Sequence, residues 1–206
     1  MLEKYYKNAL EDAKNSLLED GVIIVPTDTI YGLACLSSSK VAIDRIYDMK
    51  QRGRDKPLPL IVDTYDRLLK VVDVDLNVVK KLSKYFPGPV TLVCKRNPDF
   101  DFFDAETVAV RMVNVPLVNK IIESVDAPLC LTSANLSNEE NITDPMEIIE
   151  LFDGYIDCVF LDGKCKNSES TIVKINDDNS LTLLREGKVK FENILKEYDN
   201  AWIWAC

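Results

Sequence analysis

Short apolar runs rich in β-branched residues recur along this chain, and they limit its possible folds more than any other feature. Runs of this length favour strands, and the amphipathic stretches between several of them favour helices. The predicted strands are Val22–Val25, Leu58–Val62, Val90–Cys94, Val108–Met112, Pro128–Leu131, Cys158–Leu161, Thr171–Ile175 and Leu181–Leu184. About eight strands and about six helices in irregular alternation predict an α/β protein with a large twisted mixed sheet.

Helices are predicted where hydrophobic residues recur at helical spacing or where end signals occur. The predicted helices are residues 3–18, a helix capped by Ser39, Leu76–Phe86, Pro116–Val125 and a helix capped by Asp144. Neither a repeat nor a Pro/Gly-rich linker divides the chain, so we expect one domain over residues 1–206, with its core at about 8–198 and a tail at 199–206. The two tryptophans of the tail indicate docking onto the body of the protein or onto a partner.

The chain contains no histidine. This excludes Ser-His-Asp and Cys-His catalysis and removes the commonest transition-metal ligand. An enzyme of this composition must use carboxylates, hydroxyls, cations or a hard metal such as Mg²⁺. We expect any Mg²⁺ to come with a substrate and predict no metal that protein side chains bind tightly.

The overall charge and the hydrophobic pattern bear on location and partners. A net charge of −9 argues against broad attraction to nucleic acid. The six cysteines show no CxxC spacing, so we expect free thiols. No apolar run approaches the ~20 residues that span a bilayer, and the first residues lack the pattern of a secretory signal. The expected location is the cytoplasm, without a membrane association.

A basic segment stands out in this acidic chain. Between Lys50 and Lys56 four cations occur against one acid. Cations near a helix end often complement the helix dipole in solvent. However, the segment lies in a predicted loop before a strand, where ligand sites are common, and alternating lysine and arginine suit a polyphosphate. We therefore take Lys50, Arg52 and Lys56 as candidate phosphate-binding residues.

Polar residues follow several predicted strands, which indicates a shared polar site at strand ends. The segments "PTDTIYGL", "LTSANLS" and "SESTIVKI" each place hydroxyls or amides beside an apolar run. Arg111 interrupts another apolar run, so it needs either a structural carboxylate or an anionic ligand. Neither a Walker A motif nor a GxGxxG fingerprint occurs. The residues alone thus predict an anion-binding polar cleft.

Taken in order, these segments resemble the YrdC/TsaC family of L-threonylcarbamoyladenylate synthases. The resemblance rests on "PTDTIYGL", "KQR" with "KPLPLIV", "FPGPVTL", "TVAVRM", "LTSANLS", and "ESTIVKI" with "LLREG". It implies a single YrdC-like domain with flanking helices and a large, positively charged cavity. It also implies synthesis of threonylcarbamoyl-AMP and pyrophosphate from L-threonine, bicarbonate and ATP with Mg²⁺. The product would reach a tRNA-modifying transferase complex that acts next to the anticodon; direct tRNA binding stays open.

The resemblance also implies roles for individual residues. Lys50, Arg52 and Lys56 would carry the catalytic charge. The implied ATP site comprises Lys50, Arg52, Ser133, Asn135, Ser137 and Arg185. The implied threonine site comprises Thr27, Thr29, Tyr31, Lys56, Arg111, Ser170 and Thr171. The chain departs from the family pattern at two places. Many relatives have a proline and a histidine near Val113–Val115, and many have glycine at the position of Asn138.

Two alternatives compete with the synthase. One is an RNA-binding module that grips tRNA or double-stranded RNA, which the net charge of −9 disfavours. The other is an enzyme that forms a carbamoyl adenylate, as in the much larger hydrogenase-maturation carbamoyltransferases.

Overall fold

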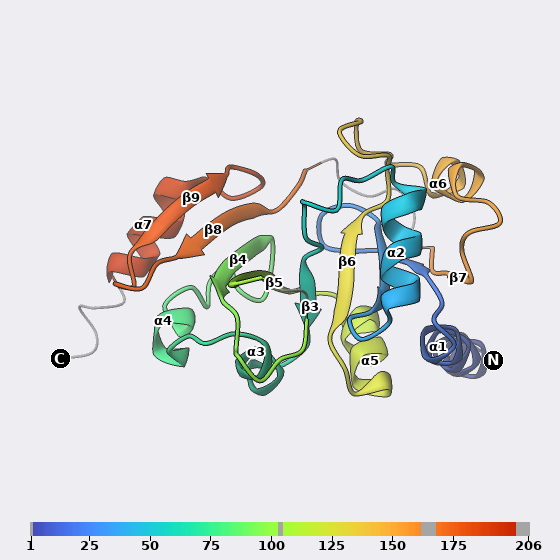
Figure 1. The fold of residues 1–206 in the computed structure, drawn as a ribbon, viewed down its shortest axis with the longest axis horizontal. Coiled ribbons are helices and arrows are strands. Elements are labelled where there is room, and N and C mark those ends of the chain that lie inside the picture. The colour runs from blue at the N-terminus through green and yellow to red at the C-terminus, as the bar shows by residue number, and fades with distance from the viewer. Residues whose placement is uncertain (1, 103–104, 162–167, 201–206) are drawn as a thin grey trace.

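The computed structural model describes residues 2–102, 105–161 and 168–200 (Figure 1). The strands in these ranges are β1 (Ile23–Val25), β2 (Gly32–Leu36), β3 (Leu60–Val62), β4 (Val90–Lys95), β5 (Thr107–Met112), β6 (Leu129–Ser133), β7 (Cys158–Val159), β8 (Thr171–Ile175) and β9 (Leu181–Arg185). They form one sheet in the order β7-β1-β2-β6-β3-β5-β4-β8-β9. Parallel pairs such as β3 with β5 and antiparallel pairs such as β2 with β6 both occur, so the predicted mixed α/β sheet is confirmed.

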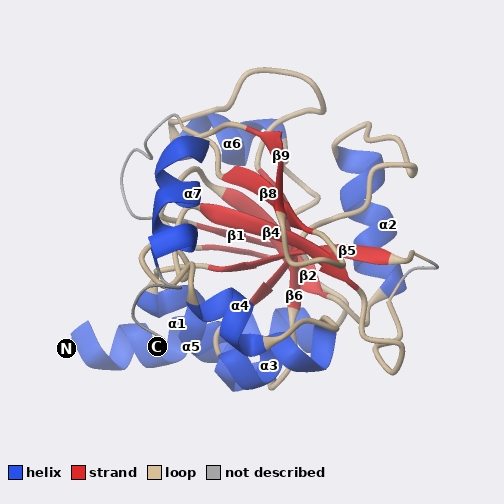
Figure 2. Cartoon of the chain, turned by 90° about the vertical axis from the view of Figure 1, so that its left-hand side faces the viewer, coloured by secondary structure: helices blue, strands red, loops and turns tan. Residues whose placement is uncertain are grey.

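Helices surround this sheet (Figure 2). They are α1 (Leu2–Leu18), α2 (Lys40–Met49), α3 (Tyr65–Val71), α4 (Leu76–Lys80), α5 (Pro116–Val125), α6 (Pro145–Leu151) and α7 (Phe191–Asn200). The predicted end signals of two helices are confirmed. The side chain of Ser39 accepts a hydrogen bond from the backbone N–H of Ala42, and the side chain of Asp144 accepts one from Met146.

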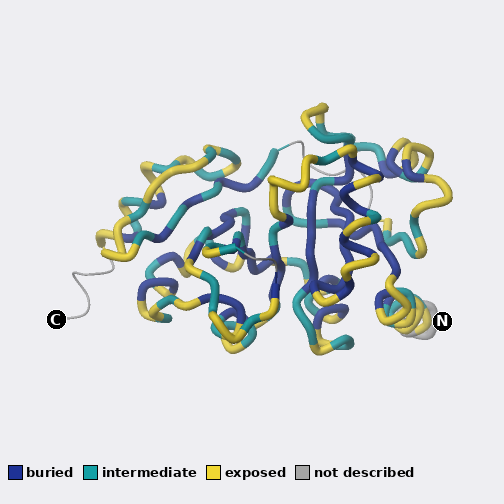
Figure 3. The backbone as a smooth tube through the Cα atoms, in the orientation of Figure 1, coloured by how far each residue is buried: buried dark blue, intermediate teal, exposed yellow. Residues whose placement is uncertain are grey.

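The two faces of the sheet pack into separate hydrophobic clusters. Successive residues of a strand point to opposite faces, so Ile24 joins the cluster that includes α2, while Ile23 and Val25 join the cluster with α1 and α5. Both faces are covered in this part of the sheet, and its strands are accordingly buried (Figure 3). This explains why the strands appear in the sequence as continuous apolar runs rather than as alternating patterns.

Several predicted elements need correction. Strand β2 and helices α3 and α7 were not predicted. The predicted helix Leu76–Phe86 ends at Lys80, because the next backbone N–H groups bond three residues back: Leu82 donates to Val79 and Ser83 donates to Lys80. Such bonds tighten the chain into turns instead of continuing an α-helix.

Three further predictions concern thiols, the tail and membranes. The described cysteines Cys35, Cys94, Cys130 and Cys158 are free. Residues 201–206, which hold both tryptophans of the tail, lie outside the described residues. Within the described ranges no helix is both long enough and apolar enough to cross a bilayer.

Candidate functional site

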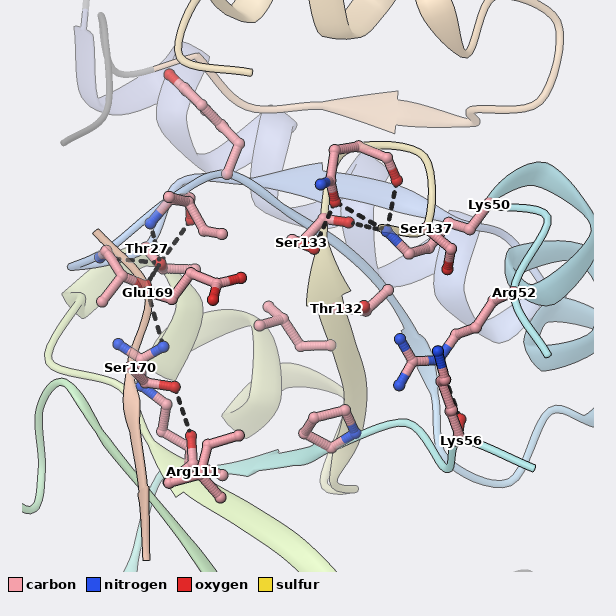
Figure 4. Close-up of a pocket in the computed structure, with 18 of the residues that line it drawn as sticks. Thr27, Lys50, Arg52, Lys56, Arg111, Thr132, Ser133, Ser137, Glu169 and Ser170 are labelled. Carbon is pink, nitrogen blue, oxygen red and sulfur yellow. Dashed lines mark hydrogen bonds between the residues drawn. The ribbon is translucent and has the colours of Figure 1, made fainter. Parts of the chain in front are cut away.

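A cavity of about 370 Å³ lies against the sheet on the face that carries α1 and α5 (Figure 4). Ile61 and Leu131, which belong to the cluster under those helices, contribute apolar surface to it. Its polar lining comes from the loop after β1, the loop after α2, strand β5, the end of β6 and the β8–β9 hairpin. Every predicted site residue except Thr171 lines this cavity. The topology thus brings together five segments that are far apart in the sequence.

The loop after β1 is shaped by its own hydroxyl groups. Thr27 Oγ1 accepts hydrogen bonds from the backbone N–H groups of Thr29 (3.1 Å) and Ile30 (3.2 Å) and donates one to the carbonyl of Ile30 (2.6 Å). A threonine that bonds to the backbone ahead of it stabilises a tight turn. Thr27 therefore organises the loop that carries Thr29 and Tyr31 to the cavity.

Arg111 is bound by a carboxylate, one of the two kinds of partner that the sequence left open, and it also lines the cavity. Its Nη2 donates to Asp28 Oδ1 (2.5 Å), Nη1 donates to Thr29 Oγ1 (3.1 Å) and Nε donates to the carbonyl of Gly88 (2.9 Å). Gly88 has φ 148°, a backbone conformation that a side chain would disfavour. The Pro-Gly-Pro turn therefore helps to position the arginine. Sequence reasoning missed Asp28, although it lies inside the quoted "PTDTIYGL" segment.

Replacing Asp28 by alanine should lower the free energy of unfolding by about 3–5 kcal/mol, because a buried arginine would lose its partner. The side chains of Arg111 and Asp28 are only 6% and 16% exposed. Urea denaturation of both proteins measures the difference. The matched control is Glu197→Ala, which breaks the exposed Lys84–Glu197 pair and should cost less than about 1 kcal/mol. Equal losses in the two variants would contradict the structural role of Asp28.

Lys50 ties the end of α2 to the loop after β6. It is 1% exposed, and its Nζ donates to the carbonyls of Ser133 and Asn135 (both 2.5 Å) and to Asn135 Oδ1 (3.2 Å). Burial, and then the charge of Arg52, lower the pKa of Lys50 to about 7. The three acceptors oppose this, since each N–H of the ammonium group finds an oxygen. Lys50 lines the cavity, but its ammonium group is bonded to the protein.

The other cations of the basic segment divide into two groups. Arg54 pairs with Asp44 and Asp48 of α2 and covers the ring of Tyr47, so the helix-end interpretation holds for this residue. Arg52 and Lys56 instead line the cavity (Figure 4). Arg52 is partly buried, and its Nε donates to the carbonyl of Lys56 (3.0 Å), which orients the guanidinium group. Burial lowers the pKa of Arg52.

The departure at Asn138 has a conformational explanation. Asn138 has φ 67°, in the left-handed region that glycine favours and that asparagine tolerates better than most residues. Its Oδ1 accepts a hydrogen bond from Lys56 Nζ (3.3 Å) at the mouth of the cavity. Asn138 thus adopts a conformation that glycine favours and adds a polar contact.

The β8–β9 hairpin forms another wall. Ser170 Oγ and Thr91 Oγ1 share a hydrogen bond (2.8 Å), and Arg185 pairs with Glu169 (2.7 Å). Thr171, which the sequence assigned to the threonine site, is not among the lining residues: its fully buried Oγ1 donates to the carbonyl of Val189 and accepts from the N–H groups of Gly187 and Val189. Sequence reasoning assigned no role to Glu169, although "SESTIVKI" contains it.

Cations outnumber acids in the lining of the cavity. The lining cations are Lys50, Arg52, Lys56, Arg111 and Arg185, and the lining acids are Glu139 and Glu169. Hydroxyls and amides from Ser133, Asn135 and Ser137 lie between them. A site of this kind suits an anionic ligand that also offers hydrogen-bonding groups. Among the described residues no group of three or more histidine, cysteine or acidic side chains could hold a metal ion.

Known proteins are similar in sequence to this chain along most of its length. The family model named Sua5/YciO/YrdC, described as "Telomere recombination", matches residues 15–187. A Methanocaldococcus jannaschii protein, provisionally named a threonylcarbamoyl-AMP synthase, is 32% identical over 94% of this chain and 93% of its own length. The threonylcarbamoyl-AMP synthase of Pyrococcus abyssi is 31% identical over 89% of this chain and 55% of its own length.

Solved structures show the same fold. The P. abyssi Sua5 protein complexed with L-threonine has a TM-score of 0.82 at 30% identity, over 91% of this chain and 56% of the other. Escherichia coli YciO has a TM-score of 0.81 at 23% identity, over 90% and 92% of the two chains, and supports the fold alone. The chain thus spans little more than half of the P. abyssi protein. With most of its residues matched by the family model and a relative above 30% identity along nearly its whole length, the chain belongs to the Sua5/YciO/YrdC family, as its motifs predicted.

Proposed function

We propose that this chain is a threonylcarbamoyl-AMP synthase, which joins L-threonine, bicarbonate and ATP into threonylcarbamoyl-AMP and pyrophosphate. The main observation behind this proposal is one cavity that combines five cations with a hydroxyl- and amide-rich loop. The names of the M. jannaschii and P. abyssi relatives support it, as does the L-threonine in the P. abyssi structure.

The reaction places two demands on the protein. The threonine amine adds to carbon dioxide and loses a proton, or condenses with bicarbonate and releases water, and either route gives a carbamate. A carbamate oxygen then attacks the α-phosphorus of ATP in line, and the bond from this phosphorus to the leaving pyrophosphate breaks. The protein must hold the two substrates in contact and stabilise the negative charge of the transferring phosphoryl group. Neither demand needs a histidine base, so the composition of the chain is compatible with this chemistry.

We assign the two substrates to different parts of the cavity, since Arg52 and Lys56 lie apart from Ser170 and Arg111 (Figure 4). Arg52 and Lys56 would bind the triphosphate, and Lys50 would contribute by fixing the loop of Ser133 and Asn135 beside the nucleotide. Ser137 would bind the same nucleotide. On the far side of the cavity, the proposed threonine site comprises Thr29, Tyr31 and Ser170, with Thr27 and Arg111 as supports. As the sequence predicted, Arg185 is assigned to ATP, and Lys56 also to threonine.

Mg²⁺ would arrive as the ATP complex, and we assign it no protein ligand. Magnesium bound through substrate phosphates is common in such sites. We further propose that the product passes to a tRNA-modifying transferase complex and that the chain works in the cytoplasm.

Pyrophosphate release tests the proposal. The protein is incubated with ATP, Mg²⁺ and bicarbonate, with threonine, with carbamoyl phosphate, or with neither. Threonine-dependent release is expected. Release that instead requires carbamoyl phosphate would favour the carbamoyl-adenylate alternative. Binding of tRNA without any turnover would favour the RNA-binding module.

A further inference from the structure

A second cavity, of about 650 Å³, lies between the start of α2 and the loop that joins β4 to β5. Ile43 and Phe102 line it, and both belong to the hydrophobic cluster on the α2 face of the sheet. The first cavity lies on the opposite face, under α1 and α5. Helix α2 begins at the second cavity and ends at Lys50 in the first (Figure 1). The two cavities are therefore separate sites.

Helix α2 starts at this second cavity with unpaired backbone donors. The side chain of Ser39 accepts a hydrogen bond from the N–H of Ala42, which satisfies one donor of the first turn. The N–H groups of Lys40 and Val41 meet no acceptor in the described ranges. Unpaired N–H groups and the positive end of the helix dipole favour an anion at this place. Many helices begin this way without a ligand, so the case depends on the side chains around them.

Ser37 adds a buried hydroxyl group to the same place. Its N–H donates to the carbonyl of Pro128 (3.1 Å), which continues the pairing of β2 with β6. Successive residues of a strand point to opposite faces, and Cys35 packs on the α2 face, so the side chain of Ser37 points to that face too. Ser37 is only 8% exposed and lines the cavity, yet its hydroxyl bonds to no residue that the structure describes. A buried polar group without a partner indicates a missing one.

Arg96 brings a positive charge from the β4–β5 loop, and its orientation is fixed. Its Nε donates to the carbonyl of Ala105 (2.9 Å), and its Nη1 donates to the carbonyls of Phe100 (2.6 Å) and Asn97 (3.3 Å). All three partners are neutral, and Nη2 bonds to no described residue. A guanidinium group held in one orientation with N–H groups to spare suits an anionic oxygen ligand.

The two acids in the lining do not cancel these donors. Asp44 already pairs with Arg54, and Asp101 is exposed, where water screens its charge. The apolar surface comes from Ile43 and Phe102, which are buried. A volume of about 650 Å³ exceeds what a free phosphate ion fills and is typical of cavities that hold small organic molecules.

We infer that the second cavity binds a small phosphate monoester whose organic part rests on Ile43 and Phe102. Its phosphate group takes the free N–H groups at the start of α2, the hydroxyl of Ser37 and Nη2 of Arg96. A phosphate monoester offers three acceptor oxygens and a charge of about −1.5 to −2, which matches these three sources of donors better than a carboxylate does. The inference does not depend on the proposed function, because none of these residues lines the first cavity.

Amide NMR of the whole ¹⁵N-labelled chain locates the binding. The probes are phenyl phosphate, inorganic phosphate, and benzyl alcohol, which keeps the ring but lacks the charge. Phenyl phosphate should shift the amide signals of Lys40 and Val41 saturably and should bind more tightly than inorganic phosphate. Benzyl alcohol should bind at least about tenfold more weakly than phenyl phosphate, because it cannot use the charged contacts.

Two variants separate the contacts. Ser37→Ala should weaken phenyl phosphate binding about 10-fold, and Arg96→Met about 10- to 100-fold, the range expected for hydrogen bonds between charged groups. Ser37→Ala should leave the free energy of unfolding unchanged, because the hydroxyl has no partner to lose. It therefore decides the matter alone if Arg96→Met fails to fold.

Lys95→Met is the matched control, because it removes a cation next to Arg96 in the sequence but Lys95 does not line this cavity. It should leave the dissociation constant within about twofold of wild type. The inference is overturned if phenyl phosphate produces no saturable shift at Lys40 and Val41, or shifts only signals of the first cavity such as that of Ser137. A dissociation constant that Ser37→Ala leaves unchanged, or that Lys95→Met raises as much as Arg96→Met does, would overturn it as well.

Discussion

Replacing Arg52 by alanine should lower the rate of threonine-dependent pyrophosphate release about 100- to 1000-fold while the chain stays folded. One preorganised charge contact to a developing transition state is typically worth this much. Arg52 is partly buried, lines the cavity and is oriented by the carbonyls of Lys56 and Pro57. Lys56→Ala should have a similar effect, because Lys56 lines the same side. The rate is measured at saturating ATP, and thermal melting checks the fold.

Arg54→Ala provides the matched control for these variants. It removes the same charge from the same loop, but Arg54 turns away from the cavity toward Asp44 and Asp48. Its activity should stay within about twofold of wild type, since exposed ion pairs contribute little. Near-normal turnover of Arg52→Ala and Lys56→Ala at saturating ATP would show that the phosphate assignment is wrong. An equal loss in Arg54→Ala would point to net charge instead of a specific contact.

The strands could be predicted where local residue preference and burial agree. The run Thr171–Ile175 matches β8 at both ends because β-branched residues occupy a strand buried between β4 and β9. Strand β2 was missed because its sequence, "GLACL", contains a glycine and no β-branched residue. Its strand conformation comes from pairing with β1 on one side and β6 on the other, which is tertiary information.

The site was predictable as a set of segments, but less so as a set of contacts. Hydroxyls and cations at strand ends correctly indicated which segments meet at the cavity. What each group bonds depends on burial and on partners distant in sequence. Lys50 looked like a free cation, yet it bonds to the carbonyls of Ser133 and Asn135. Glu169 was given no role from the sequence, because its ion pair with Arg185 in the wall of the cavity depends on the pairing of β8 with β9.

Valine should be nearly inert as a substrate in place of threonine, whereas serine should react slowly. Hydroxyl groups line the proposed threonine side of the cavity, among them those of Thr29 and Ser170, and both residues are buried. Buried polar groups that bind the substrate hydroxyl lose this partner when the substrate is valine, which has a methyl group in its place. This loss costs up to about 10⁴-fold in kcat/KM. Serine keeps the hydroxyl and lacks one methyl, so its loss should be about 10- to 200-fold.

The three amino acids are compared by kcat/KM for pyrophosphate release, with ATP and bicarbonate saturating. The structure limits which hydroxyl groups of the protein can bind the hydroxyl of threonine. The hydroxyl of Thr27 bonds to the backbone of its own loop, and the hydroxyl of Thr29 already accepts a hydrogen bond from Arg111. The expected order is threonine, then serine, then valine. This order requires that loss of the substrate hydroxyl group lowers kcat/KM more than loss of the methyl group does. If valine matches or exceeds serine, then shape rather than hydrogen bonding selects the substrate, and the hydroxyl group of Ser170 has another role.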